Sequence, residues 1–308
     1  MSFTQDRNGT VSAAKASAAK QPSEKFVLKD HYSYQELEEL VAFLYSPDGC
    51  PWDQKQTHES IKGSLVEEAW EAVDAIEEGR ADRLADELGD VLLQVIFHAE
   101  MGRVAGTFSM DDVLRNVCRK LISRHSHIFA EDTASDPKEV RALWEANKIK
   151  EKGLQSESEV LRDVPSSLPA LSRSYKIQKK AAACGFDWPD TEGTRAKLAE
   201  EAQELAEVEE QIAALDLSKA EADKLRQRLE EEAGDLLFAA VNHLRKLSID
   251  PELALNQANK KFIRRFSQME ALATEKNQAL RDLSLEAMDQ LWEEVKTQEK
   301  LGEQNAFR

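Results

Sequence analysis

The chain has 308 residues, a formal net charge of −17, a hydrophobic fraction of 41% and a charged fraction of 32%. This length allows two ordinary domains with cores of their own, and the abundance of charged helix formers favours helices over sheet. The negative charge argues against a nucleic-acid polymer or an anionic membrane as partner, but it leaves open a small anionic substrate, because a bound metal ion can reverse the field inside one site.

The N-terminal stretch, residues 1–25, is rich in small and polar residues and lacks the apolar core of a secretory signal. We predict that it is a disordered tail. No apolar run along the chain has the length of a membrane span. Cys50, Cys118 and Cys184 show no paired spacing, so we expect a reducing, cytoplasmic location.

Helical periodicity dominates the first half of the chain, where apolar residues recur at three- and four-residue steps. The predicted helices are Tyr34–Tyr45, Ile61–Glu78, Arg83–Val104 and Met110–Phe129. The turn-rich stretch Ser46–Asp53 separates the first two helices. No segment alternates in the way that a strand requires, so a sheet is not expected.

The second half repeats this plan. Its predicted helices are Leu171–Cys184, Thr194–Leu215, Lys219–Leu247, Pro251–Thr274 and Ser284–Glu299. We therefore predict an all-α fold of two tandem helical-bundle domains that arose by internal duplication. The predicted domains are residues 26–153 and 171–308, and the Gly-, Ser- and Pro-containing residues 154–170 form the predicted linker.

Each half contains two short acidic motifs, in the same order, which we call the acidic phrases of that half. Their acidic residues are Glu68, Glu71, Glu87 and Asp90 in the first half and Glu201, Glu204, Glu232 and Asp235 in the second. Spacing of i and i+3 places the carboxylates of a phrase on one face of a helix. Two such helices facing each other make a cage of oxygen ligands suited to Mg²⁺, and Mn²⁺ prefers the same ligands.

The surroundings of the phrases strengthen the metal prediction, which a single acidic pair in a chain with 58 acidic residues would not carry. Each Asp runs into an apolar segment, Val91–Phe97 or Leu236–Val241, that we expect to be buried. With no cation in the same sequence window, buried carboxylates need a metal to neutralise them. Gly89 and Gly234 precede the aspartates and leave room for a neighbouring helix or ligand.

Cationic pairs follow the acidic phrases in each half. Spaced four apart are Lys120 with Arg124, Trp144 with Lys148, Lys261 with Arg265, and Trp292 with Lys296. This spacing puts each pair on one helical face, where the cations can hold phosphate oxygens. The alternative is that surface cations lie beside a core tryptophan; the recurrence in both halves favours the phosphate role.

The two halves differ in the spacing between their acidic phrases. Glu68 and Glu201 are 133 residues apart, whereas Glu87 and Glu232 are 145 residues apart. The second half therefore has 12 extra residues. Since 12 residues make about three turns of helix, we predict a longer helical hairpin near Leu215–Lys224.

In combination and order these motifs resemble the MazG family of nucleoside triphosphate pyrophosphohydrolases, within the all-α NTP pyrophosphatase superfamily. The resemblance extends from about Tyr32 to Glu299. Beyond the acidic and cationic motifs it draws on Gly49–Asp53, Arg124–Phe129, Lys176–Lys179 and Gly185–Trp188.

The resemblance implies a homodimer that depends on Mg²⁺, with Mn²⁺ as a substitute. It implies hydrolysis of a broad range of NTPs and dNTPs to nucleoside monophosphate and pyrophosphate, in nucleotide-pool housekeeping or stress. Carried over, the metal ligands are Glu201, Glu204, Glu232 and Asp235, and the substrate contacts are Lys261, Arg265, Trp292 and Lys296. The matching first-half residues are Glu68, Glu71, Glu87, Asp90, Lys120, Arg124, Trp144 and Lys148. In this family the C-terminal domain is usually the hydrolytic one, so we expect the second half to be catalytic.

A mechanism follows as a hypothesis. Glu200, or Glu67 in the first half, would orient the attacking water or act as general base beside the metal-binding carboxylates. Trp188 or Trp292 would stack on the base. Two alternatives remain open: a catalytically silent helical protein that binds nucleotides or a protein partner, and a hydrolase specific for one pyrimidine or modified nucleotide.

Overall fold

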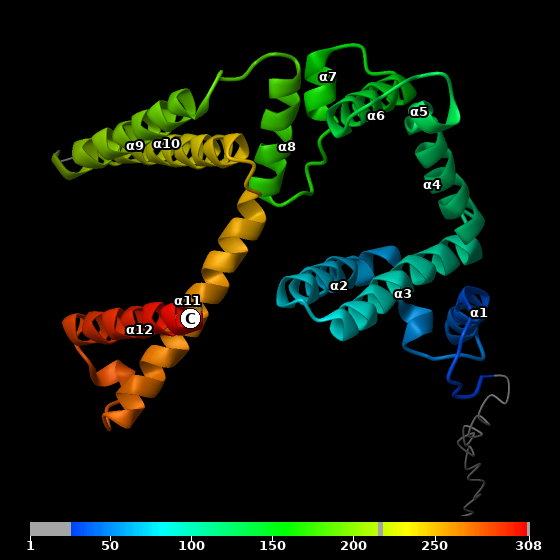
Figure 1. The fold of residues 1–308 in the computed structure, drawn as a ribbon, viewed down its shortest axis with the longest axis horizontal. Coiled ribbons are helices and arrows are strands. Elements are labelled where there is room, and N and C mark those ends of the chain that lie inside the picture. The colour runs from blue at the N-terminus through cyan, green and yellow to red at the C-terminus, as the bar shows by residue number, and fades with distance from the viewer. Residues whose placement is uncertain (1–25, 215–217, 307–308) are drawn as a thin grey trace, which may run out of the picture. The chain divides into compact units, whose positions relative to one another are not determined.

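The computed structural model describes residues 26–214 and 218–306, and all regular structure within them is helical (Figure 1). The helices up to residue 152 are α1 (Tyr34–Tyr45), η1 (Asp53–Lys55), α2 (His58–Glu78), α3 (Ala81–Ala105), α4 (Met110–Arg124), α5 (Ser126–Phe129) and α6 (Pro137–Lys152). Those that follow are α7 (Glu157–Arg162), α8 (Ala170–Ala183), α9 (Thr191–Ala214), α10 (Lys219–Lys246), α11 (Pro251–Glu275), η2 (Leu280–Asp282) and α12 (Leu285–Ala306). The all-α prediction is confirmed. No helix within the described residues is long and apolar enough to cross a membrane.

The chain divides into two compact units after Asn147, inside α6. The domain limits proposed from sequence stay a prediction. Within the predicted linker, helix α7 packs against α8, and Val160 and Val164 of this segment are buried. The predicted disordered tail, residues 1–25, lies outside the described residues.

The first unit is built around a hairpin of α2 and α3. Thr57 caps α2 through a reciprocal pair of hydrogen bonds with Ser60, and α2 ends at Gly79 in the left-handed conformation, with φ of 68°. The core of this unit joins α1 to the hairpin through Val41, Ile61 and Ile96. The hairpin holds the first acidic phrase, because Glu68 and Glu71 lie on α2 and Glu87 on α3.

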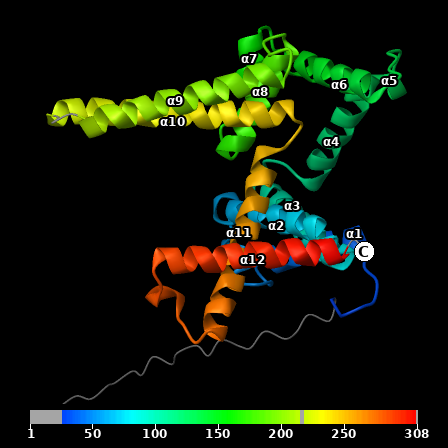
Figure 2. The ribbon, with the colours of Figure 1, turned by 60° about the vertical axis from the view of Figure 1, so that its left-hand side comes forward.

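The second unit repeats the hairpin with α9 and α10, which lie side by side in both views (Figures 1 and 2). Helix α8 packs against α10, where the Gln178 side-chain amide donates to the Phe238 carbonyl at 2.8 Å. Helices α11 and α12 form a further packed pair around Met269, Leu291 and Val295.

The extra residues of the second half lengthen the hairpin. Helix α9 continues to Ala214, ten residues past Glu204, whereas α2 continues seven residues past Glu71. Helix α10 begins 13 residues before Glu232, whereas α3 begins six residues before Glu87. Ten of the 12 extra residues therefore lie in helix, and the tip between α9 and α10 includes residues 215–217, outside the described part of the chain.

Three α-helical regions differ from the sequence prediction, one of them α7, which lies within the predicted linker. The single helix expected over Met110–Phe129 is broken at His125, whose φ of −93° and ψ of 50° are not helical and whose ring bonds the Leu121 carbonyl at 2.7 Å. Helix α6 was not predicted. Its start was nevertheless encoded, because Asp136 accepts from the backbone of Lys138 and Glu139 and is followed by Pro137 at the first helical position.

Candidate active site

A cluster of three carboxylates lies on the α9–α10 hairpin. Oxygen atoms of Glu201, Glu204 and Glu232 all lie within 4.8 Å of one another. Glu201 is 5% exposed, and the other two side chains are half-buried. Spacing of i and i+3 on α9 presents its two carboxylates to α10, as the sequence predicted.

The α2–α3 hairpin carries the corresponding cluster. Glu68, Glu71 and Glu87 likewise have oxygens within 4.8 Å of one another. Glu87 is 9% exposed, so in this half the most buried carboxylate comes from the second helix of the hairpin. The duplication therefore preserves a three-carboxylate arrangement, although the hairpins differ in length.

The fourth predicted carboxylate of each half lies farther from the other three. Asp90 and Asp235 are exposed and do not share the 4.8 Å clusters. Asp90 still lies near enough for its negative charge to help raise the pKa of Glu68. The structure therefore brings together three of the four residues predicted to bind metal in each half.

Burial and mutual repulsion raise the pKa values of three of the clustered carboxylates. The negative charge of Glu87 raises the pKa of Glu71 above its usual value. Burial, followed by the charges of Glu201 and Glu232, raises the pKa of Glu204. Burial is also the main reason that the pKa of Glu68 is raised. Each hairpin thus holds negative charges that a cation would stabilise.

Two premises of the sequence argument are wrong. The segments after the aspartates are not buried throughout, because Leu92, Leu237 and Phe238 are exposed. Cations also lie in the same sequence window. Arg83 contacts Glu87 at 3.0 Å, and Arg228 contacts Glu232 at 3.3 Å. Lys197 contacts Glu201 at 2.6 Å. Each cation lies four residues before its glutamate, so the i, i+4 rule applied to the sequence would have found all three. These ion pairs supply part of the neutralisation that the sequence argument assigns to metal alone.

The two predicted water-orienting glutamates lie beside the clusters. Glu67 and Glu200 are exposed, so solvent reaches both. Glu200 also contacts Lys197, at 3.0 Å, which ties it to the same cation as Glu201.

The predicted phosphate-binding residues form an arginine–tryptophan pair in each half. The Arg124 guanidinium lies 5.3 Å from the Trp144 ring centre, and that of Arg265 lies 6.0 Å from the Trp292 ring centre. Arg124 is 7% exposed. Arg265 is half-buried and bonds Glu299 through Nε at 2.8 Å. The recurrence shows that Lys/Arg and Trp/Lys motifs distant in sequence meet in space.

The lysines of these motifs are more open. Lys120 and Lys261 are exposed, whereas Lys148 and Lys296 are half-buried. Lys296 contacts Glu293 on its own helix. Within the described part of the second unit, no hydrogen bond, ion pair or ring contact joins the acidic cluster to Lys261, Arg265, Trp292 or Lys296.

The two histidines that follow the acidic phrases take different partners. His243 Nδ1 lies 2.9 Å from the Thr194 hydroxyl. His98 Nδ1 lies 2.8 Å from His58 Nδ1, while its buried Nε2 has no hydrogen-bond partner among the described residues. Burial, helped by His58, lowers the pKa of His98. Neither histidine belongs to a carboxylate cluster.

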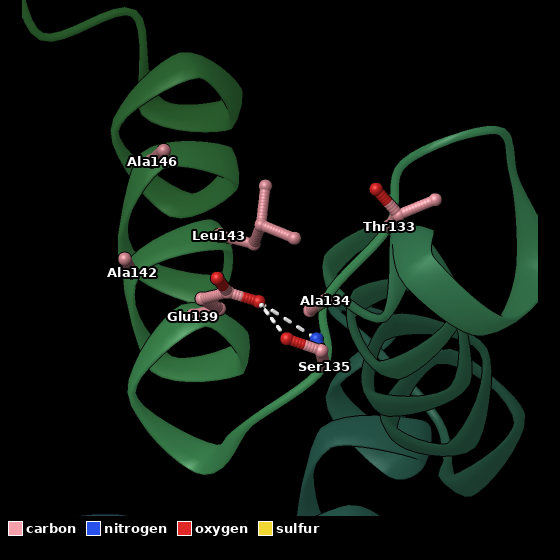
Figure 3. A pocket seen from close by; sticks show the side chains of 7 residues that line it. All are labelled: Thr133, Ala134, Ser135, Glu139, Ala142, Leu143 and Ala146. Atoms are coloured by element: carbon pink, nitrogen blue, oxygen red, sulfur yellow. Dashed lines mark hydrogen bonds between the residues drawn. The ribbon is translucent and has the colours of Figure 1, made fainter.

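A surface pocket in the first unit lies elsewhere. It is lined by α6 and by the segment before it, where the Ser135 backbone and hydroxyl both donate to the Glu139 carboxylate (Figure 3). Figure 3 shows Leu143 and Thr133 on opposite walls. No predicted site residue lines it, so it does not bear on the candidate active site.

Comparison with known proteins points to the same hairpins. The family model of the MazG nucleotide pyrophosphohydrolase domain matches residues 56–129 and 190–270, one match over each acidic hairpin. A nucleoside triphosphate pyrophosphohydrolase/pyrophosphatase MazG from Thermotoga maritima is 42% identical over 263 residues, which cover 85% of this chain and 95% of the relative.

Two further relatives agree. A nucleoside triphosphate pyrophosphohydrolase from Escherichia coli K12 is 41% identical over 261 residues, which cover 84% of this chain and 95% of the relative. YabN of Bacillus subtilis, an uncharacterized protein, is 41% identical over 270 residues, which cover 88% of this chain but 53% of that protein.

Proposed function

The chain belongs to the MazG family of nucleotide pyrophosphohydrolases, and we propose that it hydrolyses nucleoside triphosphates to monophosphate and pyrophosphate with Mg²⁺ at the cluster of Glu201, Glu204 and Glu232. The observation that carries the proposal is the convergence of these three carboxylates on one hairpin, repeated on α2 and α3. The proposed setting is maintenance of the nucleotide pool, with a broad range of NTPs and dNTPs as substrates.

The cluster fits a hard divalent cation. All three side chains offer oxygen, and Mg²⁺ and Mn²⁺ prefer oxygen ligands to imidazole or thiolate. The pKa of Glu204 is raised by burial and by its neighbours, so a cation would relieve a repulsion already present. Asp235, one turn after Glu232, is the proposed fourth ligand. When bound, Mg²⁺ would lower the pKa of an attacking water and offset phosphate charge.

Other residues of the protein would activate the water, bind the phosphates and hold the base. Exposed Glu200, adjacent to the cluster, would orient the water and accept its proton. Lys261, Arg265 and Lys296 would offset the charge that builds on departing pyrophosphate. The Trp292 ring, beside Arg265, or Trp188 before α9 would stack on the base, and stacking tolerates all bases.

We assign catalysis to the second half, as the family resemblance implies. Burial differs slightly in the same direction, because the most buried carboxylate of the second cluster, Glu201, is 5% exposed and that of the first, Glu87, is 9% exposed. A charge in a less solvated site interacts more strongly with a bound cation. The first cluster would then bind metal and nucleotide with little or no turnover.

A homodimer is the proposed assembly. Apolar side chains on α10 and α11 are exposed, including Leu237 at 60%, Phe262 at 56% and Ile263 at 63%. Large contiguous patches of exposed apolar groups often mark protein–protein interfaces. A second copy would cover them.

The proposal is tested by incubating the full-length chain with Mg²⁺ and a panel of NTPs and dNTPs, and identifying the products. We expect monophosphate and pyrophosphate from several bases. Glu232→Gln should lower pyrophosphate release about 100-fold or more, because a metal ligand is lost. The matched control is Glu231→Gln, which makes the same change at the exposed neighbouring residue and should retain activity. Undiminished release by Glu232→Gln would contradict the site assignment, and release of orthophosphate would contradict the reaction.

A further inference from the structure

Glu299, on α12, holds two neighbouring arginines of α11. Its Oε2 accepts from Arg265 Nε at 2.8 Å. Its Oε1 accepts from Arg264, from Nε at 3.1 Å and from Nη2 at 3.0 Å. The Glu299 side chain is 15% exposed, and the two helices share a packed core. The carboxylate is therefore presented to the arginines by a rigid element.

The position of Glu299 recurs in the first half of the sequence. Glu299 lies seven residues after Trp292, and Glu151 lies seven residues after Trp144. In both halves the lysine of the Trp/Lys motif lies between them, four residues after the tryptophan. Spacing of i, i+4 and i+7 keeps all three side chains on one face of a helix. The duplicated motif thus extends one turn further than the Trp/Lys pair, to a carboxylate.

We propose that Glu299 is a positioning residue of the phosphate site, which holds Arg265 by its Nε and leaves both terminal amino groups of that guanidinium for the triphosphate of the substrate. The inference rests on the proposed function. It adds to it a residue that acts on the substrate only through Arg265.

The contacts of Arg265 carry this proposal. A guanidinium has five N–H donors in a rigid planar fork. Glu299 takes the Nε donor, and the side chain makes no hydrogen bond or ion pair with any other described residue. The Trp292 ring centre lies 6.0 Å from the guanidinium carbon. Two contacts therefore fix the fork, and Nη1 and Nη2 keep donors for a bidentate bond to phosphate.

The charge balance also favours phosphate binding. Arg264 and Arg265 share one carboxylate, so the group keeps a net positive charge. The hydrogen bond from Arg265 is the main reason that the pKa of Glu299 is lowered, so the carboxylate is ionised at neutral pH. A carboxylate that blocked Arg265 would occupy the terminal amino groups, whereas Glu299 engages Nε.

The test is a double-substitution cycle in full-length chain, with kcat/KM for pyrophosphate release from Mg-ATP as the readout. We expect Glu299→Ala to lower kcat/KM about three- to tenfold, because the Arg265 side chain must then be ordered when substrate binds. Arg265→Ala alone should lower it about tenfold or more. Adding Glu299→Ala to Arg265→Ala should cause no further loss, because the residue through which Glu299 acts is already absent.

Two further variants separate positioning from support of the fold. Glu299→Gln retains an oxygen that can accept from Nε, so it should lose less activity than Glu299→Ala. The matched control is Glu294→Ala, which removes the same charge from α12 and breaks the 2.8 Å contact of Glu294 with Lys276, at the end of α11. This control should retain kcat/KM, and the melting temperature of every variant is measured beside it.

Three results would overturn the role of Glu299. The first is unchanged kcat/KM in Glu299→Ala, and the second is a higher kcat/KM, which would show that the carboxylate competes with phosphate. The third is an equal fold-loss from Glu299→Ala with and without Arg265, which would show that it merely supports the fold. These results in an active parent chain leave the proposed function standing. If the parent chain releases no pyrophosphate from any NTP, the proposed function itself fails and this inference fails with it.

Discussion

Gly234 lies in the interior of α10, just before Asp235. Substituting it tests whether substrate or a second copy approaches the acidic hairpin at this point. Apart from its chain neighbours and the backbone of its own helix, a Cβ atom added there would meet no heavy atom of the described residues within 4 Å. Alanine is favoured over glycine in a helix interior by about 1 kcal/mol. Gly234→Ala should therefore raise the melting temperature of the metal-free protein by about 2–4 °C.

The same substitution should impair function. If the glycine leaves room for substrate or a second copy, the new methyl group will obstruct that approach, and a misplacement of about 1 Å can lower a rate about 100-fold. We expect pyrophosphate release to fall at least about tenfold. The measurements are differential scanning fluorimetry, size-exclusion chromatography with light scattering, and pyrophosphate release.

The matched control is Gly63→Ala, in the interior of α2, where an added Cβ also meets no heavy atom within 4 Å. It should give a similar gain in melting temperature with little loss of activity. A stabilised Gly234→Ala variant with full activity and unchanged assembly would refute the reasoning that room is needed there. A destabilised variant would show that the helix is packed more tightly than the structure indicates.

Two further predictions concern charge and packing. The pKa values of Glu71 and Glu204 are raised, so these two groups bind more protons in the folded chain than in the unfolded chain just above the usual carboxyl pKa, and their contribution to metal-free stability should fall as pH rises through that window. The Mg²⁺-induced gain in melting temperature should therefore be larger at about pH 7.5 than at about pH 4.5, and an equal gain at both would contradict the repulsion. Val295→Ala, at a side chain 1% exposed between α11 and α12, should cost about 2 kcal/mol in urea unfolding; a loss below about 0.5 kcal/mol would show that this core is loosely packed.

Sequence periodicity was sufficient to predict the main helices because their apolar residues face a core in an amphipathic pattern. It failed at His125, where one side chain's bond to a carbonyl ends the helix, and it passed over α6, whose start depends on the Asp136 cap rather than on apolar spacing. The acidic motifs predicted three of the four carboxylates that were expected to converge in each half, because i, i+3 spacing fixes a helical face.

The remaining site features depend on distances that spacing does not contain. Asp90 and Asp235 match the motif as well as their neighbours do, yet they lie outside the 4.8 Å clusters. The ion pair of Lys197 with Glu201 could have been predicted from their i, i+4 spacing. The burial of Glu201 could not, because it depends on how α9 packs.

The central claim is that the cluster on α9 and α10 is the hydrolytic metal site. It is tested most directly by comparing Glu87→Gln with Glu232→Gln, the equivalent substitutions in the two clusters, in full-length chain with Mg²⁺ and NTP. We predict that Glu232→Gln abolishes nearly all pyrophosphate release, whereas Glu87→Gln retains most of it. The reverse pattern, or equal losses in the two variants, would contradict the assignment of catalysis to the second half.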